Sequence, residues 1–461
     1  MALSGIDGVR PAPSKGVFAQ ARARIEAVLR SEHLATQKAA GVAFAVRVAS
    51  AGIVFASQIL LARWIGDSEF GSYVYVLTWL VLAGDLVHLG LPLTAQRFIP
   101  QYNEANSLDL LRGYLLGSRL LCLGAGIATA IGGGVVVYAL ENVIERSLII
   151  PFYFACLAVP AYTLNFMIDG LARSYNWMNV ALLPAYVVRP LVLLGGVVAI
   201  RVAGFPLDAS DVLAVLATSA WIAVLLQLVQ LDRRLRRVIP PGPRRYAPAL
   251  WIKVALPMVL VWGLYTLLTS MDVLVLKYFR SAEEVAHYFA AAKVLALVAM
   301  VHFAASASTA HRFSAYHMAG DRDGLAAFAA TTVRWVFWIS LVVSLALLSI
   351  GRPVLRLFGP EFESGYPVMA ILALGMLARA SVGPIERLLG MIGHQRVCAV
   401  AYVGALAVNF SACLLLAPPY GAMGAAVATT AGFVVESILL FVIAKRYAGL
   451  HMFIWSPARQ P

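Results

Sequence analysis

Charged residues are scarce in this chain. Of its 461 residues only 13% are charged and 61% are hydrophobic, whereas soluble domains are about 25% charged and about 45 to 50% apolar. A soluble core of this size would need a polar shell, yet between about residue 39 and residue 445 only short charged stretches interrupt the apolar runs. The composition therefore excludes a soluble protein and leaves no room for a second, water-soluble domain.

Reactive and metal-binding motifs are also missing. The four cysteines lie inside apolar runs without a Cys-x-x-Cys pair, so we interpret Cys122, Cys156, Cys398 and Cys413 as packing residues. No paired-carboxylate, Ser-His-Asp or metal-ligand spacing occurs, and the predicted outer loops are short. The sequence therefore predicts no catalytic residue, no metal site and no cofactor, and it disfavours an enzyme.

The first 38 residues are polar, so we expect no cleavable signal peptide. Within them Phe18, Ala21, Ile25 and Val28 follow helical spacing beside arginines, which is consistent with a cationic helix lying on the inner leaflet. A solvated tail is an equally good interpretation.

What the chain does have is long apolar runs. A hydrocarbon core of about 30 Å takes about 20 helical residues to cross, and because unpaired backbone groups are intolerable in lipid, each run of that length is predicted to be a helix. Twelve runs lie near residues 39–63, 71–95, 113–140, 148–168, 180–201, 210–231, 251–278, 288–310, 331–351, 366–392, 397–417 and 421–444. We expect an all-α polytopic membrane protein with about twelve transmembrane helices.

Basic residues are sorted by side of the membrane. The net charge of +13 would suggest nucleic acid for a soluble protein. With the N-terminus in the cytoplasm, however, the inside segments carry 24 Lys or Arg and the outside loops carry seven. This asymmetry satisfies the positive-inside rule. It predicts a bacterial cytoplasmic (inner) membrane protein with both termini in the cytoplasm and no nucleic-acid partner.

An internal repeat crosses the basic linker around Pro240–Pro243. At an offset of 215 residues, Lys38, Glu69, Tyr73 and Arg97 match Lys253, Glu284, Tyr288 and Arg312. Six helices per half entered from the same side form a parallel repeat, which is typical of alternating-access transporters. We expect two six-helix lobes in a V around a central cavity.

This repeat divides the chain. The predicted parts are a cytoplasmic tail (1–38), an N-lobe (39–231), a basic cytoplasmic linker (232–250), a C-lobe (251–445) and a second cytoplasmic tail (446–461).

Five basic residues fall within predicted spans: Arg47, Arg119, Arg189, Lys293 and Arg379. A charge at mid-bilayer costs at least about 2.5 to 3.5 kcal/mol on insertion scales, so such residues normally face a polar interior. We interpret the five as a cationic cavity for an anionic headgroup that carries phosphate. Arg47, Lys293 and Arg379 lie nearest the span centres and are the strongest candidates.

The acidic residues within spans are Asp85, Asp272, Glu386 and Glu436. A structural alternative pairs Arg47 with Asp85, or Arg379 with Glu386, so that the charges only hold helices together. Snorkelling could explain Arg119 or Arg189. We also predict that Asp85, Asp272 and Glu386 couple transport to a proton or sodium gradient.

Histidines within the spans could have a similar role. His88 and His302 could relay protons, but a lone membrane histidine is more often a packing residue that is hydrogen-bonded to a neighbour.

Four segments resemble one known family. These are the hairpin at 60–73, Asp272 followed by an apolar run and Tyr278-Phe279, the segment 357–362, and the segment 420–429. In order and spacing they resemble the Wzx-type polysaccharide exporter and lipid-linked oligosaccharide flippase family, within the multidrug, oligosaccharidyl-lipid and polysaccharide exporter superfamily. Physically they are helix-packing devices, because Gly421, Gly424 and Ala428 form a small-residue face.

The resemblance implies transport of a polyprenyl-diphosphate-linked oligosaccharide to the outer leaflet, for an O-antigen, exopolysaccharide or capsule. Its partners would be that lipid, the membrane lipids and possible polysaccharide polymerase machinery. The chain lacks the two extra C-terminal helices of the peptidoglycan-precursor branch, which disfavours lipid II. The alternatives are an ion-coupled multidrug exporter of the same superfamily and, less favoured, a membrane glycan polymerase or ligase.

Overall fold

The computed structural model describes the backbone of residues 15–392 and 395–455. Side chains are described from residue 49 onward, except at positions 261, 307, 310, 311 and 393–396 and after 455. Within these limits the protein consists of helices and contains no strand.

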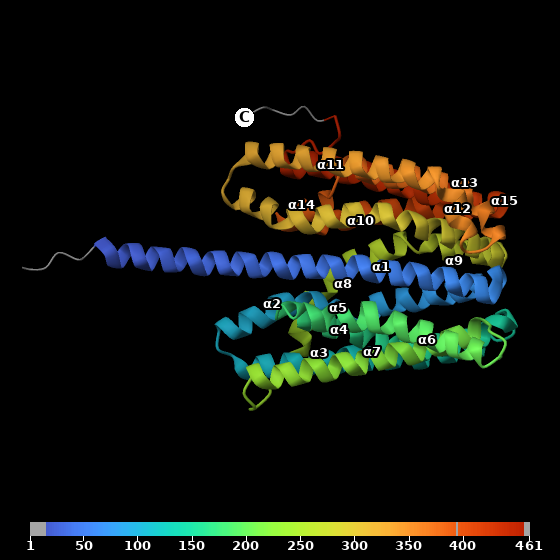
Figure 1. Ribbon diagram of the computed structural model, residues 1–461, viewed down its shortest axis with the longest axis horizontal. Coiled ribbons are helices and arrows are strands. Elements are labelled where there is room, and N and C mark those ends of the chain that lie inside the picture. The colour runs from blue at the N-terminus through green and yellow to red at the C-terminus, as the bar shows by residue number, and fades with distance from the viewer. Residues whose placement is uncertain (1–14, 393–394, 456–461) are drawn as a thin grey trace, which may run out of the picture.

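The N-terminal half contains α1 (Lys15–Val87), α2 (Leu91–Glu104), α3 (Leu108–Ala139), α4 (Arg146–Ser174), α5 (Met178–Leu183), a π-turn (Pro184–Val188), α6 (Arg189–Val202) and α7 (Ala209–Val238). The C-terminal half contains α8 (Pro248–Leu268), α9 (Met271–Phe279), α10 (Ala282–Met318), α11 (Arg322–Ser349), α12 (Gly351–Arg356), a 3-10 turn (Pro360–Gly365), α13 (Tyr366–Val382), α14 (Ile385–Met391), α15 (Gln395–Ile443) and a π-turn (Ala444–Ala448). Figure 1 shows the two halves lying one above the other with their helices roughly parallel.

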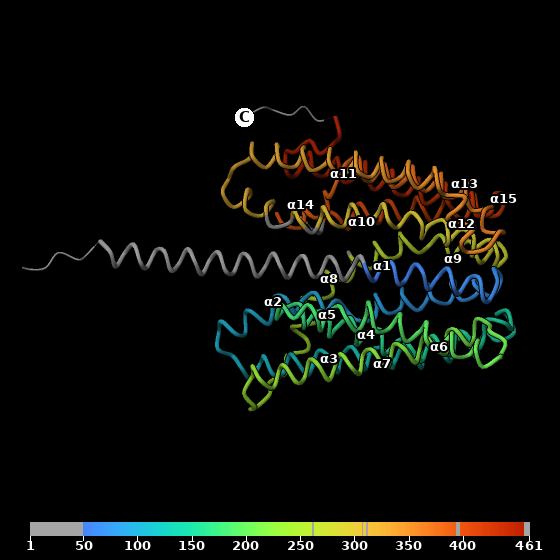
Figure 2. The backbone as a smooth tube through the Cα atoms, in the orientation of Figure 1, coloured from blue at the N-terminus to red at the C-terminus, as the bar shows by residue number. Residues whose placement is uncertain are grey.

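Ten stretches of the described chain are long and apolar enough to cross a membrane. Two of them, Ala49–Glu104 and Val397–Ala448, have 56 and 52 residues, about twice what a membrane needs. Each contains a glycine with non-helical backbone, Gly66 (φ 79°) or Gly421 (φ 57°), where the helix reverses. The trace of α1 in Figure 2 turns back at its end. Each long stretch therefore holds two crossings, which confirms the all-α polytopic fold class.

Two predicted spans were wrong as continuous helices. The run 251–278 breaks at Thr269 and Ser270, where the Thr269 hydroxyl donates to the carbonyl oxygen of Tyr265 at 3.1 Å. The run 366–392 breaks at Gly383, whose φ of 66° leaves the helical region, followed by Pro384. The run 180–201 lies in one helical stretch, Met178–Val202, that contains a π-turn at Pro184–Val188. These local changes of the hydrogen-bond ladder leave the hydropathy unchanged.

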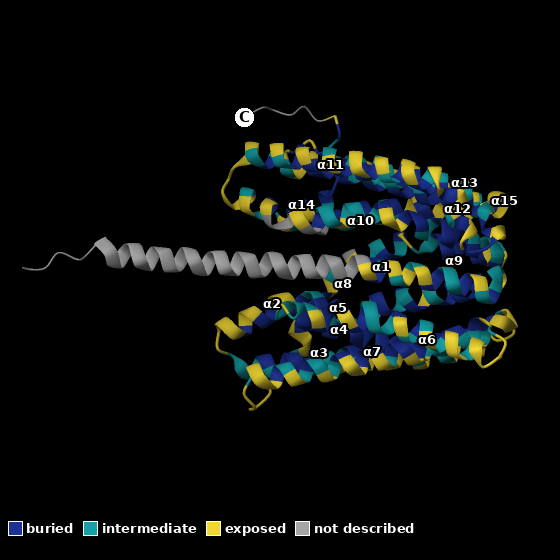
Figure 3. Cartoon of the chain, viewed as in Figure 1, coloured by how far each residue is buried: buried dark blue, intermediate teal, exposed yellow. Residues whose placement is uncertain are grey.

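The two halves pack together at one end of the bundle. That end carries Gly66 and Gly421 and lies on the right in Figure 1. The positive-inside prediction places it outside, so we call it the outer end. Buried residues are concentrated there (Figure 3). At the opposite, inner end lie the turns between α2 and α3 and between α10 and α11.

Candidate functional site

Aromatic rings close the outer end between the halves. Phe70 of α1 lies with its ring centroid 6.1 Å from Phe289 of α10 and 6.0 Å from Phe362. Phe55 packs on Phe358 at 5.7 Å. A Cβ atom on Gly71 would lie 1.8 Å from the Ala282 carbonyl oxygen, so α1 and α10 approach as closely as only glycine allows.

Polar contacts tie the same end together. The Arg63 side chain donates to the carbonyl oxygens of Leu357 (2.5 Å) and Arg356 (3.3 Å). The buried Lys277 ammonium pairs with Glu145 at 2.6 Å. Because these bonds join the N-terminal half to the C-terminal half, the molecule is closed at its outer end.

Two of the predicted cations have no described carboxylate partner. The Arg189 guanidinium, at the start of α6, lies 4.7 Å from the ring centroid of Tyr162. The Lys293 ammonium, on α10, lies 4.6 Å from the ring centroid of Phe289. Both side chains are half-buried. Among the described residues, neither cation forms an ion pair, so their charge is balanced there only by aromatic faces.

The remaining predicted cations differ from these two. Arg119 pairs with Asp232 of α7 at 2.6 Å and also donates to the Leu115 carbonyl oxygen. Arg379 pairs with Glu436 of α15 at 3.3 Å. The structural alternative pairs Arg379 with Glu386. The structure shows no ion pair between these two side chains, because α14 turns away after Gly383. The side chain of Arg47 lies outside the described residues, so its pairing with Asp85 stays a hypothesis.

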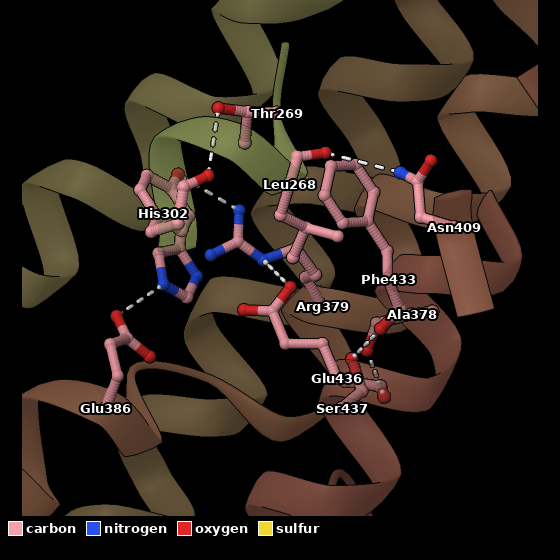
Figure 4. Close-up of polar contacts among 12 residues, drawn as sticks. Leu268, Thr269, His302, Ala378, Arg379, Glu386, Asn409, Phe433, Glu436 and Ser437 are labelled. Carbon is pink, nitrogen blue, oxygen red and sulfur yellow. Dashed lines mark hydrogen bonds and ion pairs between the residues drawn. The ribbon is translucent and has the colours of Figure 1, made fainter. Parts of the chain in front are cut away.

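The polar centre of the C-terminal half surrounds Arg379 (Figure 4). One guanidinium nitrogen donates to the Tyr265 hydroxyl at 3.4 Å, and the guanidinium carbon lies 5.3 Å from the ring centroids of both Tyr265 and Phe433. The Glu436 side chain is only 1% exposed. Glu386 lies on the other side, where its carboxylate is 3.0 Å from His302 Nε2 and accepts from Ser306 at 3.5 Å. Four chargeable side chains thus meet in the C-terminal half, three of them half-buried and Glu436 fully buried.

The other predicted coupling carboxylates are buried with hydroxyl partners. Asp272 accepts from the hydroxyls of Tyr288 and Thr429 (3.1 Å) and from the Val273 amide. Asp85 accepts from Thr266 of α8 at 3.0 Å, which is a contact between the two halves. Within the described part of the chain, no group of three or more His, Cys, Asp or Glu side chains could hold a metal ion.

Sequence reasoning did not assign Glu436 and Tyr265 to a site. Glu436 was recognisable as an acid within a span, and Tyr265 lies one turn before Thr269 on a polar stripe. Neither signal reveals the partner, because Arg379 and Glu436 come from helices far apart in the sequence.

An apolar groove lies between the halves on the membrane side. Its volume is about 470 Å³, and its lining includes Trp79 and Leu86 of α1, Leu267, Phe279 and Leu414. With no charged side chain in the lining, the groove does not suit a charged headgroup.

Residues 37–311 match the family model described as polysaccharide biosynthesis protein, which is more than half of the chain. The chain belongs to the polysaccharide biosynthesis protein family. This confirms the resemblance stated from the sequence. A second family model, MatE, matches residues 257–415 of this family member. No curated protein matches it.

Solved structures share the fold. An inward-facing multidrug resistance MATE family transporter of the MOP superfamily superposes with a TM-score of 0.73 at 14% identity, covering 88% of this chain and 98% of the other. The lipid II flippase MurJ, in an inward closed conformation, has a TM-score of 0.65 at 14% identity, covering 88% and 87%. A MOP superfamily transporter from Pyrococcus furiosus has a TM-score of 0.63 at 14% identity, covering 88% and 95%.

The chain is thus a multi-pass membrane protein of the polysaccharide biosynthesis protein family, with a second match to MatE, and it shares its fold with structures named as transporters and as a flippase. The prediction that it is not an enzyme agrees with these matches, in which the named structures are transporters and a flippase.

Proposed function

We propose that the chain is a flippase that moves an isoprenoid-diphosphate-linked oligosaccharide across the bacterial inner membrane by alternating access. The observation that carries the proposal is the match of residues 37–311 to the polysaccharide biosynthesis family. The shared fold with MurJ, named as a lipid II flippase, supports a lipid-linked substrate. The proposal keeps both termini cytoplasmic and names the glycan polymerase as a downstream partner.

Arg189 and Lys293 are the cations proposed to bind the diphosphate. Each is held over an aromatic ring and has no ion-pair partner among the described side chains. A phosphate oxygen is the ligand such a cation lacks, and a guanidinium matches it with two parallel donors. Arg47 is proposed to join them. Arg119 and Arg379 would have to leave existing carboxylates, so they contribute less.

The closed outer end gives the order of steps. With Phe70 packed against Phe289 and Arg63 bonded to Leu357, the headgroup enters from the inner end. Release outward requires those contacts to break while contacts form at the inner end. A proton or sodium gradient acting on Asp85, Asp272 or Glu386 is proposed to bias this exchange.

Ion-coupled drug export is the second candidate function. It is favoured by the MatE match over residues 257–415 and by two carboxylates in the C-terminal half, the half-buried Glu386 and the buried Glu436, which suit a cationic drug. Glu436 already has Arg379 beside it, which lowers its value as a drug ligand.

Deletion of the gene tests the proposal. We expect lipid-linked oligosaccharide to accumulate in the cytoplasmic leaflet and the surface glycan to disappear, with both effects reversed by the wild-type gene. Unchanged lipid intermediates together with new sensitivity to cationic drugs would contradict the proposal and favour drug export.

A further inference from the structure

The C-terminal half contains a cluster of titratable side chains around the buried Glu436. We call it the C-lobe cluster, and it consists of Tyr265 (α8), His302 (α10), Arg379 (α13), Glu386 (α14), and Cys398, Tyr402 and Glu436 (α15). Figure 4 labels His302, Arg379, Glu386 and Glu436. These are the titratable and charged groups that face Glu436 and Glu386 from the packed helices. Five separate helices meet there, so any change of charge acts on the packing of this half.

The cluster holds two carboxylates and one permanent cation. Arg379 contributes one positive charge, and Glu386 and Glu436 contribute one negative charge each when both are ionised. An uncompensated negative charge beside the buried Glu436 is costly. One proton held within the cluster balances Arg379 and the two carboxylates.

The Glu436 carboxylate lacks hydrogen-bond donors among the described residues. Neither of its carboxylate oxygens has a hydrogen-bond partner among the described residues, although the side chain is 1% exposed. Arg379 lies 3.3 Å away but not in hydrogen-bond geometry. Buried carboxylates are ordinarily satisfied. Asp272, in the same half, shows the contrast, because three donors reach it.

One ring nitrogen of His302 also lacks a hydrogen-bond partner among the described residues. Its Nε2 atom faces Glu386 at 3.0 Å, and its Nδ1 atom is buried without a described partner. Each carboxylate of the cluster thus has a different neighbour: Arg379 beside Glu436 and His302 beside Glu386.

We propose that the C-lobe cluster is the coupling site of the transporter and that the ion it binds is a proton, taken up by the Glu436 carboxylate. This inference rests on the proposed transport function, and it assigns the coupling to Glu436 in place of Asp85, Asp272 or Glu386. The proton comes from water, forms an O–H bond on one carboxylate oxygen, and returns to water when the site is exposed on the opposite side. No other bond changes.

The Arg379 guanidinium favours a proton over a sodium ion. A sodium ion at Glu436 would need several oxygen ligands and would lie close to a fixed positive charge. A proton needs one carboxylate oxygen and no further ligand.

Protonation would also redistribute the contacts of Arg379. With Glu436 neutral, the remaining carboxylate in the cluster is Glu386, whose charge already acts on Arg379. The contact between α13 and α15 weakens and the attraction between α13 and α14 grows, across the break at Gly383. This is how one proton biases the arrangement of five helices.

Infrared difference spectroscopy of the purified protein tests proton binding without substrate. Between alkaline and mildly acidic buffer, we expect the carbonyl band of one protonated, buried carboxyl group. Glu436→Gln removes this band, and Glu141→Gln, an exposed glutamate on the turn after α3, leaves it. A band that survives in Glu436→Gln would overturn the assignment, as would its absence from the wild-type protein.

Reconstituted vesicles separate this inference from the proposed function. We expect a pH gradient, and not a sodium gradient, to drive wild-type flipping of lipid-linked oligosaccharide. Glu436→Gln should still equilibrate the lipid between leaflets but lose the response to pH, and Glu386→Gln should lower that response. A pH response in Glu436→Gln equal to that of the wild type overturns the inference alone. No flipping by the wild-type protein overturns the proposed function, while the infrared band still reports on the site.

Discussion

Cations within the membrane have two different environments in this protein. Arg119 and Arg379 have carboxylate partners, whereas Arg189 and Lys293 lie over aromatic rings without one among the described residues. A paired charge stabilises helix packing, while an unpaired one keeps its capacity for an anionic ligand. The sequence alone placed all four within spans but could not distinguish the two kinds.

Replacing the unpaired cations should stop transport without loss of protein. We expect Arg189→Gln combined with Lys293→Gln to abolish flipping of the lipid-linked oligosaccharide, because the diphosphate loses both donors. Arg119→Gln is the matched control, and it should lower the melting temperature more than the flipping rate. Flipping by the double variant at the wild-type rate would exclude these residues as ligands.

The Arg379–Glu436 pair predicts an asymmetric response to mutation. Arg379→Gln leaves a buried carboxylate with no positive neighbour at close range, and breaking a buried pair in this way costs about 3 to 5 kcal/mol. Combining Arg379→Gln with Glu436→Gln should restore most of the loss, since neither charge remains. The measurement is the melting temperature in detergent for the four members of the cycle. A double variant less stable than Arg379→Gln would contradict the pairing.

The residues of the C-lobe cluster illustrate why the site could be predicted only in part. Arg379 and Glu386 were selected because both are charged and lie within predicted spans. Their proximity in sequence suggested a pair, but the helix break at Gly383 sends Glu386 toward His302 instead. Pairing depends on which helices pack together, and hydropathy carries no information about that.

Helices were predicted well because lipid imposes a simple requirement on them. Backbone groups in the hydrocarbon region must be bonded internally, so apolar length alone locates each crossing. Breaks were missed where a local group changes the hydrogen-bond ladder without changing hydropathy, as at Thr269 and at Gly383. The kink at Gly66 fell between predicted spans, whereas the kink at Gly421 fell on the first residue of the predicted span 421–444.

Gly71 sets how closely α1 and α10 approach at the outer end. We expect Gly71→Ala to hold the two halves apart, because its Cβ atom would meet the Ala282 carbonyl oxygen at 1.8 Å. Flipping should fall, and a cysteine introduced at Asp67 should react faster with a membrane-impermeant thiol reagent added from outside.

Gly52→Ala is the control for this prediction. It lies in the crossing of α1 before the Gly66 kink, and nothing lies within 4 Å of its added Cβ atom. Equal effects of the two substitutions would mean that the loss of a glycine from α1, and not the contact with α10, causes them.

At the scale of the whole molecule, two equivalent contacts support the predicted repeat. Glu69 accepts from the Ala209 amide at the start of α7, and Glu284 accepts from the Ala422 amide just after the Gly421 kink. Each carboxylate thus caps the last crossing of its own half. The division into two lobes stays a prediction. If the halves are repeats of each other, equivalent residues should make equivalent contacts, as these two glutamates do.

Locking the outer end should arrest the transport cycle. Asp67 and His287 face each other across the halves, with 3.5 Å between carboxylate oxygen and Nε2. We expect a short bifunctional thiol reagent to join cysteines placed at these two positions and to stop flipping. A single cysteine at either position, given the same reagent, should retain activity. Full activity of the cross-linked protein would show that this end need not open.

The linker between the halves is held by hydrogen bonds to the N-terminal half. Arg112 of α3 donates to the carbonyl oxygens of Pro240 and Pro243, and the buried Trp251 of α8 donates to the Tyr102 hydroxyl of α2 at 3.1 Å. Farther along, α8 is held by the C-terminal half, where Asn409 donates to the Leu268 carbonyl oxygen.

Helix α8 is therefore held by the N-terminal half at its start and by the C-terminal half at its end. If the two halves move relative to each other, α8 must bend between these two contacts. We expect the bend at Pro257, which removes a backbone hydrogen-bond donor from the helix. Pro257→Ala should stiffen it and slow turnover while leaving substrate affinity unchanged, which a comparison of flipping rate with lipid binding would reveal. The polypeptide that joins the two halves would then also set the speed at which they move.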